Sequence, residues 1–147
     1  MKATVLYYSH TGRTAAYSRE IAMYLWSKGI SVSMYSISDF DKSKLKDTDV
    51  LISGCWTCGW FVVMQHAHRK WREFSNEIAG KVPSERIMFF TTYKFRTGSM
   101  LNSMKKAMKI PKETKSKLLK SKTGQLTQED KNKLDEFINN INKQTRK

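Results

Sequence analysis

Three side-chain hydroxyls lie within six residues near the amino terminus, at Ser9, Thr11 and Thr14. They flank Gly12, which lets the backbone approach a ligand closely, and they separate the apolar residues 5–8 from a helical pattern. A turn between a strand and a helix directs unpaired N–H groups and the positive end of the helix dipole at one point. This combination predicts a phosphate-binding loop, and the alternative is an ordinary hydroxyl-rich turn with a Ser or Thr helix cap.

The second group of reactive side chains is Cys55 and Cys58, whose C-x-x-C spacing is more typical of redox or metal chemistry than of secreted disulfides. A dithiol switch of the thioredoxin type needs antiparallel strands in the second half of the chain, and nothing after residue 84 predicts them. With His66 and His68 the cysteines form C-x-x-C-x7-H-x-H, which suggests zinc. The helix expected here would turn the two histidines to different sides, so we favour two small, partly buried residues of a ligand loop.

A length of 147 residues suits one domain with a real core. No apolar stretch is long enough to cross a bilayer, and residues 1–4 leave no room for a signal peptide, so we expect a cytoplasmic protein. The net charge of +14 predicts acidic partners. Residues 105–147 hold 13 Lys or Arg against 5 Asp or Glu, but their only aromatic residue is Phe137, which argues against nucleic acid.

Apolar runs and helical patterns alternate along the chain. They predict strands at 5–8, 30–37, 50–54, 86–91 and 115–121, and helices at 14–28, 62–79, 99–109 and from 127 to about 142. Residues 39–49 are expected to be a loop with one short helical turn, Thr127 and Asp130 to cap the last helix, and residues 143–147 to fray. The alternation predicts a single α/β domain over residues 1–147, doubly wound around a parallel sheet.

Ligands of such sheets bind beyond the carboxyl ends of the strands. The loops at 9–14, 55–61 and 91–98 follow the first, third and fourth predicted strands. All three are therefore expected to meet at one rim.

The order Ser9-x-Thr11-Gly12-x-Thr14 resembles the [ST]-x-T-G-x-T phosphate loop of the flavodoxin family, in the same place directly after the first strand. Further similar stretches are residues 54–59, the loop that ends in Gly98, and residues 124–130 before the last helix. The resemblance implies a five-stranded parallel sheet of order 2-1-3-4-5 in three layers. It also implies non-covalent binding of FMN and a role in electron transfer.

By this resemblance, the FMN phosphate is held by the first loop, through the side chains of Ser9, Thr11 and Thr14 and the amides of His10, Thr11, Gly12 and Arg13. The other two loops would flank the isoalloxazine ring, with candidate contacts from Trp56, Thr57, Cys58, Gly59, Trp60, Thr91, Thr92, Tyr93, Lys94 and Gly98. Cys58 stands where similar proteins place a ring-packing residue. The sequence leaves open whether Trp56, Trp60 or Tyr93 stacks on the flavin instead.

The short chain has no long insertion that could build a substrate pocket, which favours an electron carrier over an enzyme. The net charge of +14 makes an acidic protein the expected redox partner. The alternatives are an FMN-dependent oxidoreductase that acts on a quinone or another small acceptor, and a related domain with weak or lost flavin binding. Lys94 and Arg96 stand where acidic members of the family carry carboxylates. Cations there predict a higher two-electron potential than that of an acidic flavodoxin.

Overall fold

The computed structural model describes residues 1–10, 12–60 and 63–145, and it is built on a parallel sheet. The parallel strands are β1 (Lys2–Tyr8), β2 (Ser31–Ser36), β3 (Val50–Trp60), β5 (Ile87–Thr92) and β6 (Leu118–Ser121). They lie in the order β2-β1-β3-β5-β6. Counted among the parallel strands alone, this is the predicted order 2-1-3-4-5, so the predicted fold is confirmed.

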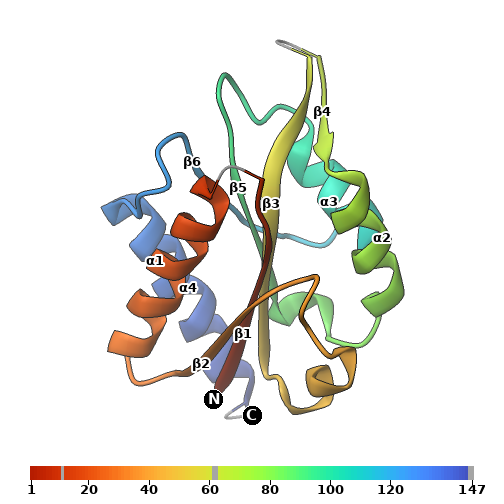
Figure 1. Cartoon of the computed structure of the whole chain (residues 1–147). Coiled ribbons are helices and arrows are strands. Elements are labelled where there is room, and N and C mark those ends of the chain that lie inside the picture. The colour runs from red at the N-terminus through yellow and green to blue at the C-terminus, as the bar shows by residue number, and fades with distance from the viewer. Residues whose placement is uncertain (11, 61–62, 146–147) are drawn as a thin grey trace.

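Helices cover both faces of the sheet and complete three layers (Figure 1). On one face lie α1 (Arg13–Ser27) and α4 (Gln128–Thr145), and on the other α2 (Arg69–Ile78) and α3 (Met100–Ala107). Strand β5 is buried throughout: Phe90 packs in the core under α1 and α4, and Phe89 packs in the core under α2 and α3. This two-sided burial explains why the central strands are apolar without alternation.

Two short 3-10 helices, η1 (Lys42–Asp47) and η2 (Ser84–Arg86), lie in the connections that lead into β3 and β5. The Asp41 carboxylate caps η1 by accepting a hydrogen bond from the Ser43 N–H at 3.0 Å. The short helical turn predicted within residues 39–49 is therefore confirmed.

The segment after β3 is the part of the fold that the sequence predicted wrongly. Strand β3 continues to Trp60 and pairs antiparallel with β4 (Val63–Ala67), where residues 55–60 were expected to be a loop and residues 62–68 helix. A short apolar run with two β-branched valines fits a strand as well as a helix, and pairing along β3 decides in favour of the strand. Helix α2 begins only at Arg69, where the Nδ1 atom of His68 accepts the Lys70 N–H at 3.1 Å.

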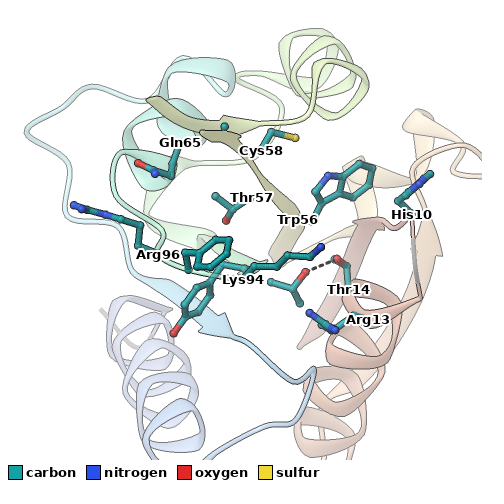
Figure 2. A pocket seen from close by; sticks show the side chains of 13 residues that line it. His10, Arg13, Thr14, Trp56, Thr57, Cys58, Gln65, Lys94 and Arg96 are labelled. Carbon is teal, nitrogen blue, oxygen red and sulfur yellow. Dashed lines mark hydrogen bonds between the residues drawn. The ribbon is translucent and has the colours of Figure 1, made fainter. Parts of the chain in front are cut away.

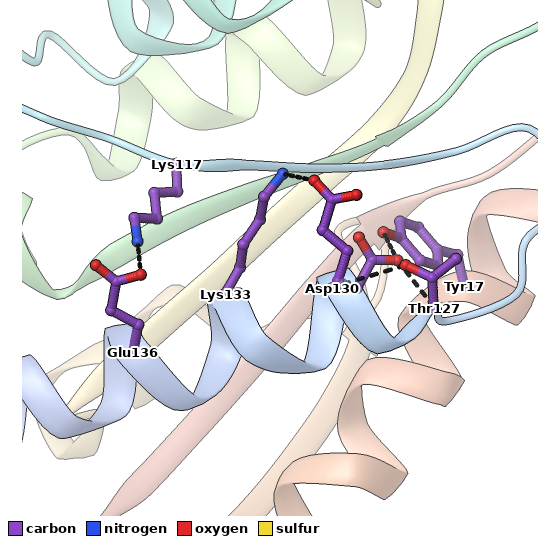
Figure 3. Close-up of polar contacts among 7 residues, drawn as sticks. Tyr17, Lys117, Thr127, Asp130, Lys133 and Glu136 are labelled. Atoms are coloured by element: carbon purple, nitrogen blue, oxygen red, sulfur yellow. Dashed lines mark hydrogen bonds and ion pairs between the residues drawn. The ribbon is translucent and has the colours of Figure 1, made fainter.

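The start of α4 is held by the predicted pair Thr127 and Asp130 (Figure 3). The Asp130 N–H donates to Thr127 Oγ1 at 3.2 Å, and the Thr127 N–H donates to Asp130 Oδ2 at 3.1 Å, which is a capping box. The buried Tyr17 hydroxyl of α1 also donates to Asp130 Oδ2, at 2.9 Å. Burial and the nearby Asp130 carboxylate raise the pKa of Tyr17, so this link between α1 and α4 keeps its proton.

Helix α4 continues to Thr145, and residues 146 and 147 lie outside the described residues. Fraying of residues 143–147 and the single-domain assignment stay predictions. Within the described ranges, no helix combines the length and the apolar character that a bilayer crossing requires.

Candidate functional site

A pocket of about 280 Å³ lies at the carboxyl ends of β1, β3 and β5, where the sequence predicted a ligand site (Figure 2). Its lining combines aromatic, hydroxyl and cationic side chains from distant parts of the chain. These residues are His10, Arg13, Thr14, Trp56, Thr57, Cys58, Gly59, Gln65, Thr92, Tyr93, Lys94, Phe95 and Arg96.

The first loop brings the start of α1 to this pocket. Gly12 precedes the helix with φ +90°, a backbone conformation that favours glycine, and its N–H donates to Ser9 Oγ at 3.0 Å. The first intrahelical bond of α1 runs from the Ala16 N–H to the Gly12 carbonyl, so the amides of residues 13–15 come too early for a helical acceptor. Among the described residues, no side chain caps this end, which leaves amide donors for an anion.

Pairs of threonines join the loops that line the pocket. Thr14 Oγ1 and Thr92 Oγ1 lie 2.7 Å apart and are buried, so α1 is tied to the end of β5. Thr91 donates to the Cys55 carbonyl at 2.7 Å and lies 2.8 Å from the Thr57 hydroxyl. Thr91 therefore supports the pocket floor and does not belong to its lining.

Trp56 is held in the pocket wall by an aromatic cluster. Its ring centroid lies 5.2 Å from that of Tyr8, 5.6 Å from that of His10 and 4.8 Å from that of His68. Burial, with Lys70 and the other nearby cations, lowers the pKa of His68 and favours its neutral ring. Packing of this kind limits the orientations of the indole and presents it as a rigid wall.

The two cysteines occupy different environments on β3. Cys55 is buried in the core, and the half-buried Cys58 lines the pocket opposite His66 on β4. Residues three apart on a strand are separated by about 10 Å, beyond the roughly 7 Å that a disulfide can span. Desolvation by burial raises the pKa of both thiols, which opposes thiolate chemistry.

The argument from sequence against zinc assumed a helix at His66 and His68, and that assumption is wrong because His66 lies on β4 and His68 precedes α2. In the part of the chain that the structure describes, no group of three or more His, Cys, Asp or Glu side chains could hold a metal ion.

Three lining residues are absent from the predicted ligand contacts: Gln65, Phe95 and Arg96. Of these, Arg96 was predicted only as a positive charge that raises the potential of the flavin. Gln65 lies on β4 and is only 6% exposed. The Ser99 hydroxyl, at the start of α3, donates to the Gln65 carbonyl at 2.7 Å and so holds β4 against this helix. The helix expected over residues 62–79 concealed this placement. Gly98 lies behind the lining, since a Cβ added there would stand 2.1 Å from Gln65 Oε1.

Most of the predicted contacts do lie together. Those that line the pocket are His10, Arg13, Thr14, Trp56, Thr57, Cys58, Gly59, Thr92, Tyr93 and Lys94. Ser9, Gly12, Thr91 and Gly98 lie outside the lining, while Thr11 and the Trp60 side chain lie outside the described residues.

The pocket is electropositive. Its described lining holds Arg13, Lys94 and Arg96 but neither Asp nor Glu. The sequence itself has no carboxylate side chain within residues 1–19, 50–72 or 86–112, the segments that build the rim. A flat aromatic wall beside free amides and cations suits a planar ligand that carries an anionic group.

Comparison with known proteins agrees with a site for such a ligand. The family model described as Flavodoxin matches residues 5–138. A flavodoxin from Clostridium beijerinckii is 26% identical over 104 residues, which are 71% of this chain and 73% of that protein.

Two solved structures show the shared fold. A flavodoxin from the domain Archaea has a TM-score of 0.68 at 18% identity and matches over 100% of both chains. The two-electron reduced flavodoxin of Megasphaera elsdenii has a TM-score of 0.60 at 20% identity, over 80% of this chain and 82% of that one.

Proposed function

This chain belongs to the flavodoxin family of flavin-binding electron-transfer proteins, and we propose that it binds FMN in the pocket at the carboxyl ends of β1, β3 and β5. One observation carries the proposal. The hydroxyl-rich loop ends at the first turn of α1, whose amides have no side-chain cap among the described residues. Residues of this turn line a pocket whose walls include Trp56 and Tyr93.

The donor set fits the phosphate of FMN. The amides of Arg13 and Thr14 lie in the first turn of α1, where amide N–H groups and the helix dipole favour an anion. If Thr92 donates to Thr14 Oγ1, the Thr14 hydroxyl proton is available for a phosphate oxygen. The Ser9 hydroxyl accepts from Gly12 and so shapes the loop.

The rest of the pocket fits a planar ring. Trp56 is fixed by its aromatic neighbours, and Tyr93 continues β5, its N–H donating to the Ser121 carbonyl at 3.1 Å. We assign stacking on the isoalloxazine ring to these two side chains. Cys58 and Gln65 would contact the ring as neutral groups, because burial keeps the Cys58 thiol protonated.

FMN, when bound, supplies reversible one- and two-electron redox chemistry. The chain's own residues orient the ring, shield it from water with the side chains of Trp56 and Tyr93, and leave cations but no carboxylate in the described lining of the pocket. We propose that the electropositive rim also selects an acidic redox partner protein, since complementary charge steers association.

Titration of the apo-protein with FMN tests this function. The visible absorbance of the flavin is followed together with quenching of tryptophan fluorescence. Trp56→Ala is expected to lower the affinity about tenfold or more, because it removes a stacking wall. Trp26→Ala is the matched control, since Trp26 is 72% exposed on α1 and outside the pocket lining.

Wild-type protein that fails to bind FMN would overturn the proposal. So would an equal loss of affinity in the Trp26 and Trp56 variants, because the wall would then have no specific part in binding.

A further inference from the structure

The cations of the pocket are not evenly placed. Arg13 is the first residue of α1, and Lys94 follows Thr92, whose hydroxyl lies 2.7 Å from that of Thr14. Figure 2 shows the Lys94 side chain extending across the pocket toward Thr14, with Arg13 beside it, while Arg96 points away from them. Two of the three lining cations therefore gather at the amide-rich end of the pocket.

No carboxylate neutralises this pair within the described structure. The four ion pairs found there join Lys42 to Glu77, Arg69 to Glu73, Lys117 to Glu136, and Lys133 to Glu129. None of them includes Arg13 or Lys94, and both side chains are exposed. Each is thus available to an anion that enters the pocket.

We propose that Arg13 and Lys94 form a cationic clamp that selects a doubly charged phosphate monoester. This inference rests on the proposed function and names the charge that the ligand must carry. A phosphate monoester has a charge of about −1.5 to −2 at neutral pH, and two cations with the start of α1 match it. Riboflavin, which has the same ring without the phosphate, gains nothing from the clamp.

The clamp also joins two loops through one ligand group. Arg13 belongs to the first loop and Lys94 to the third, and the Thr14–Thr92 contact already holds the ends of these loops together. A phosphate bound between the two cations reduces their mutual repulsion. Binding of the phosphate therefore stabilises the loop that carries Tyr93, beside the ring site.

The test compares FMN with riboflavin on the apo-protein at low and high salt. Lys94→Gln and Arg13→Gln are each expected to lower the affinity for FMN about tenfold, the scale of a hydrogen bond to a charged group. Their affinity for riboflavin should stay within about twofold of wild type. Lys94→Arg keeps the charge and should retain most of the preference for FMN.

Lys122→Gln is the matched control, because the Lys122 ammonium lies 5.7 Å from the centre of the Tyr93 ring but Lys122 is outside the lining. It removes one positive charge and should leave the ratio of the two affinities unchanged. Added salt should lower the ratio in wild type more than in Lys94→Gln, because ions screen the clamp.

Two results would overturn the clamp while leaving the proposed function intact: unchanged FMN affinity in both glutamine variants, or an equal loss for FMN and riboflavin. Unchanged FMN affinity would mean that these cations do not contact the phosphate. An equal loss for both flavins would mean that they contact the ring. Wild-type protein that binds neither flavin overturns the clamp and the proposed function together, so the two failures are distinguishable.

Discussion

The buried contact between Thr14 and Thr92 links stability to ligand binding, and valine substitutions separate the two effects. Valine has nearly the shape of threonine, so Thr14→Val removes a hydroxyl with little change in packing. The hydroxyl of Thr92, a residue that is only 3% exposed, then loses its partner across the 2.7 Å contact. An unsatisfied buried hydroxyl costs roughly 1–3 kcal/mol, and we expect Thr14→Val to lower the free energy of unfolding by about that amount.

The double variant Thr14→Val/Thr92→Val should cost less than the sum of the two single variants. With both hydroxyls gone, neither is left without a partner, and the pair is replaced by apolar contact. The expected coupling free energy is about 1–2 kcal/mol. Urea denaturation of the apo-protein, followed by tryptophan fluorescence, measures each corner of this cycle.

Binding of FMN is the second measurement. Thr14→Val should lower FMN affinity about tenfold, because it removes a hydroxyl donor to the phosphate as well as the contact with Thr92. Thr4→Val is the matched control: Thr4 Oγ1 and Thr48 Oγ1 also lie 2.7 Å apart, but neither residue lines the pocket. It should lower stability and leave FMN affinity unchanged.

Additive single and double effects would refute the argument for stability, since they would mean that the two hydroxyls do not depend on each other. An equal loss of FMN affinity in Thr4→Val would refute the argument for binding, because general destabilisation would then explain both.

Three further predictions concern the strand, the helix cap and the thiols. Gly54→Ala should lower the free energy of unfolding by roughly 3 kcal/mol or more in urea denaturation, because the new Cβ would stand 2.1 Å from a backbone oxygen of β5; a loss below about 1 kcal/mol would contradict the close approach. His68 has a lowered pKa in the folded state, so the unfolded chain takes up the proton first as the pH falls through the ordinary histidine range. The free energy of unfolding should therefore decrease from pH 7.5 to about 5, because protonated Nδ1 can no longer accept the Lys70 N–H. His68→Asn keeps an acceptor and should make the free energy of unfolding less dependent on pH. An unchanged slope in this variant would contradict the role given to His68. Cys55 should react with iodoacetamide only after unfolding and Cys58 more slowly than a free thiol, with raised pKa as the cause; mass spectrometry showing rapid labelling of native Cys55 would contradict its burial.

The β3–β4 hairpin shows where local pattern ceases to decide structure. Residues 60–67 can be arranged with an apolar face as a helix or as a strand, and their neighbours in the sequence do not settle the choice. Pairing of Thr57 with Ala67 and of Cys58 with His66 settles it, together with the bonds that Ser99 and Ser103 make to β4. Gln65 enters the pocket wall as a result, so the incorrect helix and the missed contact have one cause.

The sequence alone determined the alternation of strands and helices, the hydroxyl-rich loop before α1, and the absence of carboxylates from the rim segments. These features depend on residues close together in the chain, where periodicity and turn chemistry act directly. Only the tertiary structure decided that Thr14 meets Thr92, 78 residues away, and that Lys94 reaches across the pocket toward them. Such contacts depend on how distant elements pack, which no local pattern specifies.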